Sequence, residues 1–158
     1  MPNSIRTCLW FRDGRGPEAA AFYCALIPNS RVERVFRFDN GMGAASVTDF
    51  SLGGVPYQIL DAGPHFTLSE AVSISVETAD QAESDRLWYA LTADGGEESA
   101  CGWLKDRYGV SWQVFPKRLT ELTMHADKAI SQAAMTEMMK QKKIDIAAIE
   151  AAVKGVAQ

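Results

Sequence analysis

The chain has 158 residues, of which 47% are hydrophobic and 23% charged, and its formal net charge is −4 with a pI near 5.2. This composition predicts an ordinary folded globular protein and excludes a disordered or fibrous chain. The acidic balance, without a cluster of Lys and Arg, argues against nucleic acid as a partner. No apolar run reaches the roughly 18 to 20 residues of a membrane span, so we expect no membrane association.

The cysteines and the first residues indicate a cellular compartment. The chain has three cysteines, Cys8, Cys24 and Cys101. Three is an odd number, and their spacing is not that of metal ligands. The opening residues MPNSIRTC lack the apolar core of a signal peptide. We therefore expect a cytoplasmic protein with reduced thiols.

The first part of the chain predicts a strand, a helix and three further strands. The apolar run 5–11 reads as a strand, and Gly14 and Gly16 interrupt it before Pro17 begins a helix. An Asn-Gly turn signal at 40–41 then favours an antiparallel meander with strands at 31–38, 44–54 and 55–60. A linker rich in turn residues follows at 61–70.

The same order then restarts. Residues 71–78 alternate as a strand, and a helix over 79–96 ends at a Gly-Gly pair. A compact pairing of EESACGW with LKDRYG leads into a strand at 110–115. The chain ends in helices that we predict at 117–124, 126–141 and 144–154.

A repeated segment relates the two halves. GGVPYQIL at 53–60 returns as YGVSWQVF at 108–115, with a glutamine at the same place, Gln58 and Gln113. LWYAL at 87–91 likewise resembles FYCAL at 22–26. We therefore predict an α+β protein of two βαβββ modules, 1–62 and 63–117, with a C-terminal helical tail at 118–158, forming one structural domain overall.

These segments resemble a known family. The arrangement, with the motifs GPHFTLSEAVSISVET, QAESDRLW and CGWLKDRYGVSWQ, is similar to the PhnB-like branch of the vicinal oxygen chelate (glyoxalase/bleomycin resistance) superfamily. That branch is often labelled a 3-demethylubiquinone-9 3-methyltransferase domain. The resemblance implies that each module curls its sheet into a half-barrel and that the half-barrels enclose a pocket.

The alternation of strand residues then predicts which side chains face that pocket. If Gln58 and Gln113 point inward, one face also carries Pro56, Leu60, Ser111 and Phe115. The other face, which should pack under the helices, carries Tyr57, Ile59, Trp112 and Val114. The two amides either recognise a ligand or bond to each other.

The resemblance also allows a test for metal. Metal-using relatives carry His or Glu at four strand positions, which correspond here to Arg6, Gln58, Ala71 and Gln113. None of these is a good ligand for a transition metal. If the match at these positions is shifted by one residue, Ile5 or Thr7 takes the place of Arg6, and Glu70 or Val72 takes the place of Ala71. Only Glu70 could then be a ligand, and one carboxylate alone does not make a metal site. We predict no metal and no other cofactor.

The remaining candidates each have a structural alternative. Glu70 could be a general base or bind a cation, or it could be a surface carboxylate. Four tryptophans, Trp10, Trp88, Trp103 and Trp112, could stack on a planar ligand, although aromatic residues on such strands and amphipathic helices also suit a core. Cys101 could line the pocket with Trp103, or it could occupy a small buried packing position. His65 and His125 are expected to be solvated or locally bonded.

Three functions remain open at this point. The first is metal-independent binding of a small organic molecule. The second is an enzyme, glyoxalase-like, dioxygenase-like or another lyase or transferase, on a small organic substrate with or without metal. The third is an interaction module with a vestigial pocket. A methyltransferase is not favoured, because a Rossmann-type cofactor site needs a glycine-rich turn between a strand and a helix. The segment FRDGRGPEAA has only two glycines, Gly14 and Gly16. We expect a homodimer.

Overall fold

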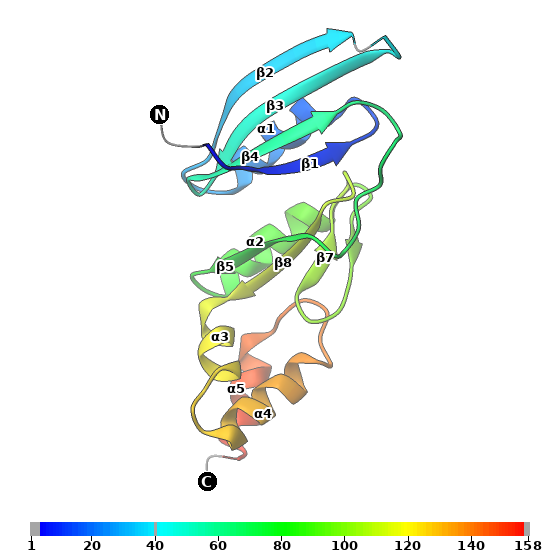
Figure 1. The fold of residues 1–158 in the computed structure, drawn as a ribbon. Coiled ribbons are helices and arrows are strands. Elements are labelled where there is room, and N and C mark those ends of the chain that lie inside the picture. The colour runs from blue at the N-terminus through cyan, green and yellow to red at the C-terminus, as the bar shows by residue number, and fades with distance from the viewer. Residues whose placement is uncertain (1–3, 40, 157–158) are drawn as a thin grey trace. The chain divides into compact units, whose positions relative to one another are not determined.

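The computed structural model describes residues 4–39 and 41–156, which belong to two compact units, Met1–Leu68 and Ser69–Gln158 (Figure 1). Each unit contains one four-stranded sheet and at least one helix packed on it. The three C-terminal helices belong to the second unit. The predicted linker at 61–70 spans the division between the units.

The first unit has the predicted βαβββ order. Its elements are β1 (Thr7–Phe11), α1 (Gly16–Leu26), β2 (Arg31–Asp39), β3 (Ala44–Leu52) and β4 (Val55–Asp61). The sheet order is β1-β4-β3-β2, in which β1 pairs with β4 in parallel and the other pairs are antiparallel. Asn40 of the predicted Asn-Gly turn lies outside the described residues.

The second unit repeats this order with a shorter meander. It contains β5 (Ser73–Thr78), α2 (Gln81–Thr92), β6 (Glu97–Glu98), β7 (Trp103–Lys105) and β8 (Ser111–Pro116), in the sheet order β5-β8-β7-β6. The helix predicted over 79–96 is shorter at both ends. Asp80 caps it by accepting a hydrogen bond from the Glu83 N–H at 2.9 Å, and the left-handed backbone of Asp94 and Gly95 follows its last turn.

Each sheet buries one face against its helix, as the alternation predicts. In the first unit α1 packs on β3 and β4 and encloses Leu9, Tyr23, Phe50 and Ile59. In the second unit α2 packs on β7 and β8 and encloses Trp88, Leu91, Trp112 and Val114. Trp88 and Trp112 are therefore core residues. The opposite face of each sheet is the open face, and it carries Gln58 in the first unit and Gln113 in the second.

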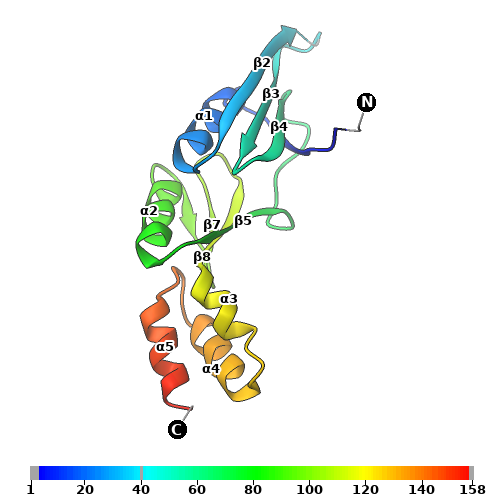
Figure 2. The same ribbon diagram turned by 90° about the vertical axis from the view of Figure 1, so that its left-hand side faces the viewer.

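The three C-terminal helices lie next to one another (Figure 2). Their buried side chains form a small core. The helices are α3 (Lys117–Thr123), α4 (Lys128–Met138) and α5 (Ile146–Lys154). The helix α4 is shorter than predicted at both ends, and its later start follows from Asp127, which caps it by accepting a hydrogen bond from the Ala129 N–H. The buried residues of this core are Leu119, Leu122, Ala134, Ile144, Ile149 and Val153. Among the described residues, no helix has both the length and the apolar character that crossing a membrane requires.

Candidate functional site

A row of four side chains crosses the open face of the first sheet. Strand pairing places Cys8 of β1 beside Gln58 of β4, Gln58 beside Asp49 of β3, and Asp49 beside Arg34 of β2. Arg6, two residues before Cys8, reaches the same carboxylate. Because paired residues in neighbouring strands point to the same face, all of these groups converge at one place.

Asp49 is the centre of this group. Its side chain is buried, and its Oδ1 accepts hydrogen bonds from Gln58 Nε2 at 2.8 Å and Arg6 Nη1 at 2.9 Å. Its Oδ2 accepts a third from Arg34 Nη2 at 2.5 Å. We call Arg6, Arg34, Asp49 and Gln58 the Asp49 cluster. Two guanidinium groups face one carboxylate, so the cluster carries one positive charge in excess.

The protonation of Asp49 follows from these contacts. Burial by itself raises the pKa of this carboxyl, but the hydrogen bonds from Gln58, Arg34 and Arg6 and the charge of Arg6 outweigh burial. The pKa of Asp49 therefore lies below its usual value. At neutral pH the group is a carboxylate that holds both arginines in position.

Cys8 lies at the edge of the cluster as a neutral thiol. Its pKa is raised by burial of the sulfur and, to a smaller extent, by the negative charge of Asp49, while a backbone hydrogen bond at Leu60 acts in the opposite direction. A raised pKa leaves little thiolate at neutral pH, and the thiolate is the reactive form. The Asp49 cluster therefore does not activate Cys8 as a nucleophile.

Trp10 lies on the same open face and is engaged by the segment after β4. Its Nε1 donates to the Gly63 carbonyl at 2.9 Å, and its ring packs edge-on against Phe66 with centroids 4.8 Å apart. The ring of His65 also lies beside the Trp10 ring, with centroids 6.1 Å apart. This agrees with the prediction that His65 interacts only with nearby residues. Trp10 thus forms an apolar border to the open face.

In the second unit, three of the predicted site residues meet in one small cavity. Glu70, Trp103 and Ser111 line a space of about 130 Å³ together with Lys105. Glu70 Oε1 lies 2.6 Å from Lys105 Nζ, and the hydrogen bond from Lys105 lowers the pKa of Glu70. A general base at neutral pH benefits from a raised carboxyl pKa, so this contact does not favour that role for Glu70.

The other predicted residues of this unit have local partners. Gln113 Nε2 donates to Ser73 Oγ at 2.9 Å, whereas Gln58 bonds to a carboxylate, so the two repeated amides differ in chemistry. Phe115 packs against the tail core. Cys101 is half-buried rather than buried as the packing interpretation expected, and its Sγ lies 3.5 Å from Met139 Sδ. The fold thus brings together Trp103, Ser111 and Glu70. The tail is instead contacted by Phe115 and Cys101.

The residues at the expected metal positions do not fit a metal ion. Arg6 is a cation, Gln58 and Gln113 are neutral amides, and Ala71 has no ligand atom in its side chain. Asp49, the nearby carboxylate, is engaged by two arginines. Within the ranges 4–39 and 41–156, no three or more His, Cys, Asp or Glu side chains are grouped so that they could hold a metal.

Sequence reasoning identified Arg6 and Gln58 but missed Asp49, Arg34 and Lys105. A signal for Asp49 was present, because it is the one acidic residue of the strand AASVTDFSL, and a carboxylate in such a strand is rarely buried without a partner. Asp49 has two charged partners, Arg34 and Arg6, which lie 15 and 43 positions away along the chain. Only the strand pairing in the folded structure identifies them.

Comparison with known proteins assigns the fold. The family described as 3-demethylubiquinone-9 3-methyltransferase matches residues 3–115. A protein solved from Bacillus cereus as a putative 3-demethylubiquinone-9 3-methyltransferase, PhnB, is 28% identical, with a TM-score of 0.64 over 72% of this chain and 99% of that chain. Protein PA1353 from Pseudomonas aeruginosa is 22% identical, with a TM-score of 0.61 over 73% of this chain and 98% of that one.

A more distant similarity extends to the fosfomycin resistance protein FosX from Listeria monocytogenes, at 14% identity and a TM-score of 0.51 over 77% of this chain and 96% of that chain. This last similarity concerns the fold alone. No curated protein matches the sequence significantly. The family match covers most of the chain, so the protein belongs to the 3-demethylubiquinone-9 3-methyltransferase family, the PhnB-like branch of the vicinal oxygen chelate superfamily.

Proposed function

We propose that this protein binds a small organic molecule bearing a carboxylate or phosphate-like group at the Asp49 cluster, without a metal ion. The observation that carries this proposal is the excess of one guanidinium over carboxylate on an open sheet face. The Arg34 side chain is 66% exposed and that of Arg6 30% exposed, so both retain N–H groups accessible to a ligand. Planar guanidinium groups suit the oxygens of such anions.

Asp49 has a supporting role in this proposal. By accepting from both arginines, it fixes their orientation before a ligand arrives, which reduces the conformational entropy that binding costs. Gln58 donates to Asp49 through Nε2, which leaves its amide oxygen for a donor on the ligand. A ligand anion would therefore meet a preorganised group of donors.

The surroundings of the cluster favour a ligand with an apolar body. Phe36 lies two residues after Arg34 on the same face of β2 and is 58% exposed, and Phe38 stacks on it with centroids 5.8 Å apart. Trp10 borders the face on β1. Large exposed aromatic side chains beside fixed polar groups are typical of small-molecule sites.

The methyltransferase named in the family description receives no support from the fold. Rossmann-type cofactor sites belong to a mostly parallel, doubly wound sheet. Here each sheet has one parallel pair, and its other pairs are antiparallel.

An enzyme that uses Glu70 as its general base is also not favoured. The hydrogen bond from Lys105 lowers the pKa of the Glu70 carboxyl.

Thermal shift and calorimetry with matched compounds test the proposal. Benzoate and phenyl phosphate should raise the melting temperature in the presence of EDTA, because a ligand that binds only the folded state stabilises it. Benzamide, which lacks the charge, should not. Arg34→Gln should weaken benzoate binding at least tenfold, whereas Arg31→Gln, an exposed arginine of the same strand paired with Glu33, should leave it unchanged.

Two results would overturn the proposal. One is benzoate binding that survives both Arg34→Gln and Arg6→Gln. The other is binding that appears only after a divalent metal is added, together with about one metal ion per chain in elemental analysis of the purified protein.

A further inference from the structure

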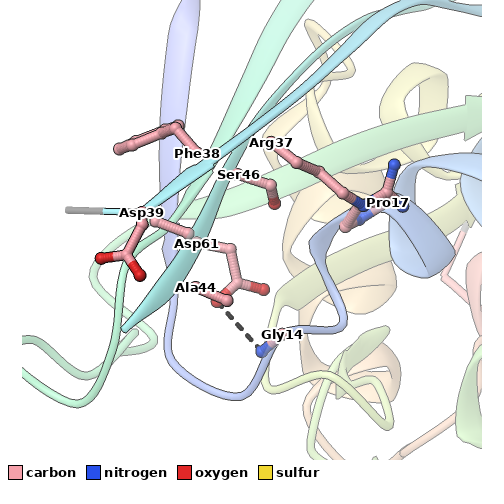
Figure 3. A pocket seen from close by; sticks show the side chains of 9 residues that line it. Gly14, Pro17, Arg37, Phe38, Asp39, Ala44, Ser46 and Asp61 are labelled. Carbon is pink, nitrogen blue, oxygen red and sulfur yellow. Dashed lines mark hydrogen bonds between the residues drawn. The ribbon is translucent and has the colours of Figure 1, made fainter. Parts of the chain in front are cut away.

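A cavity of about 430 Å³ opens on the helix-covered side of the first sheet, beside the first turn of α1 (Figure 3). Strand pairing sets three polar residues in a row across its floor, Arg37 of β2 beside Ser46 of β3, and Ser46 beside Asp61 of β4. Residues of one sheet face alternate with those of the other, so this row lies on the face opposite the Asp49 cluster. The two sites are therefore distinct.

Two groups in the cavity have no partner within the described part of the chain. Ser46 is 7% exposed, and its hydroxyl makes no hydrogen bond to the described residues. Figure 3 shows its side chain between Arg37 and Asp61. Arg37 makes no hydrogen bond or ion pair with the same set of residues. Ser46 is buried and Arg37 is exposed, so a ligand in the cavity can pair with a hydroxyl and a guanidinium group that no described residue engages.

The opposite side of the cavity is acidic. Asp61 is buried and accepts hydrogen bonds from the N–H groups of Gly14 at 3.1 Å and Gly16 at 2.8 Å, which hold its carboxylate at the start of α1. Asp39 adds a second carboxylate to the lining. An anion alone would meet two carboxylates, and a cation alone would leave Arg37 unpaired next to it.

From this charge pattern we propose that the cavity binds a small zwitterion, with a free α-amino acid as the simplest case. Its carboxylate would pair with Arg37 and accept a hydrogen bond from the Ser46 hydroxyl. Its ammonium would face Asp61, whose oxygens retain lone pairs after accepting the two glycine N–H groups. Pro17 and Ala44 supply an apolar wall for the side chain. The inference does not depend on the function proposed for the Asp49 cluster.

Leucine and two analogues that each lack one charge test this proposal on the full-length chain. The analogues are 4-methylpentanoate, which lacks the ammonium, and 3-methylbutylamine, which lacks the carboxylate. Binding is followed by calorimetry and by the backbone amide NMR signals of Gly14 and Gly16. Leucine should bind and shift both signals, and each analogue should bind at least tenfold more weakly.

Variants separate binding from stability. Arg37→Gln should weaken leucine binding at least tenfold, and Arg31→Gln on the same strand should not change it. Ser46→Ala should weaken leucine binding severalfold without lowering the melting temperature, because the hydroxyl has no partner to lose.

Three results would overturn the proposal. The first is no shift of the Gly14 and Gly16 signals at 10 mM leucine. The second is equal binding of either analogue, which would make the cavity a site for a simple anion or cation. The third is leucine binding that Arg37→Gln leaves unchanged.

Discussion

Single residues on the open face of the first sheet are coupled through Asp49. This carboxylate is buried and has three side-chain donors, two of them cations. Its contribution to stability depends on remaining ionised, and the contribution of the arginines to ligand binding depends on its position. A change at Asp49 therefore affects folding and recognition together.

Asp49→Asn should lower the free energy of unfolding by about 1–3 kcal/mol at pH 7, because it removes a buried charged acceptor and leaves Arg6 and Arg34 facing each other. The folded-state pKa of Asp49 is lowered. Its stabilisation is therefore present above the unfolded pKa near 4 and is lost as pH falls through the folded value. Urea unfolding at pH 7 and at about pH 3 should show the difference between the two proteins shrinking at acid pH.

Glu33→Gln is the control for this experiment, since Glu33 forms an exposed pair with Arg31 on the same strand. Such pairs contribute about 0–1 kcal/mol. Equal stability of the Asp49→Asn variant and the parent at pH 7 would contradict the structural role of the cluster.

The two repeated glutamines should behave differently when replaced by leucine. Gln58→Leu removes a donor from a buried carboxylate and should cost about 1–3 kcal/mol, whereas Gln113→Leu frees only the half-buried Ser73 hydroxyl and should cost less. Because each amide bonds within its own sheet, the losses should add to within about 0.5 kcal/mol in the double variant. Recovery of stability in the double variant would instead indicate a bond between the two amides. Urea unfolding measures all three variants.

Among the elements, the segment between α4 and α5 is bound by hydrogen bonds to the loop before β7 and to α2. The N–H groups of Cys101 and Gly102 donate to the carbonyls of Gln141 and Lys142, at 2.8 and 2.7 Å. Gln81 of α2 donates to the Ile144 carbonyl at 2.8 Å and accepts from the Ile146 N–H at 2.9 Å. The segment between α4 and α5 is thus held by hydrogen bonds, and the helices themselves by their apolar core.

Ile149→Ala should destabilise this tail by about 2–5 kcal/mol, since Ile149 is fully buried in its core. Loosening the tail should also speed hydrogen exchange of the Cys101 and Gly102 amides, which depend on it. The exposed Val156→Ala should change neither quantity appreciably. Unchanged exchange at both amides in Ile149→Ala would show that the loop before β7 holds its conformation without the tail.

For the whole molecule, the homodimer predicted from the sequence stays a prediction. Several large apolar side chains of the first unit are more than half exposed, including Phe36, Met42, Val55 and Phe66. Such groups together favour association. Light scattering should give a molar mass of twice 17.3 kDa, the mass of one chain. The Phe36→Ser variant should give a molar mass closer to that of one chain. A mass of one chain at all concentrations would refute the dimer.

The sequence by itself determined the secondary structure, its order and the buried face of each sheet. These properties are local: strand alternation placed Ile59, Trp112 and Val114 under the helices, and the repeat of Gly-Val and Gln predicted the second module. The helix at 79–96 was predicted too long because capping by Asp80 and the left-handed turn at Asp94 are decided over one or two residues.

Only the tertiary structure decided which polar groups meet. Asp49, Arg34 and Arg6 come from different parts of the first unit, and their contact depends on strand register, which a single sequence specifies only weakly. The same holds for the row of Arg37, Ser46 and Asp61 and for the pairing of Glu70 with Lys105. Hydrophobic burial follows residue type and can be recognised locally, whereas a hydrogen bond between distant residues depends on the position of both partners in the folded chain.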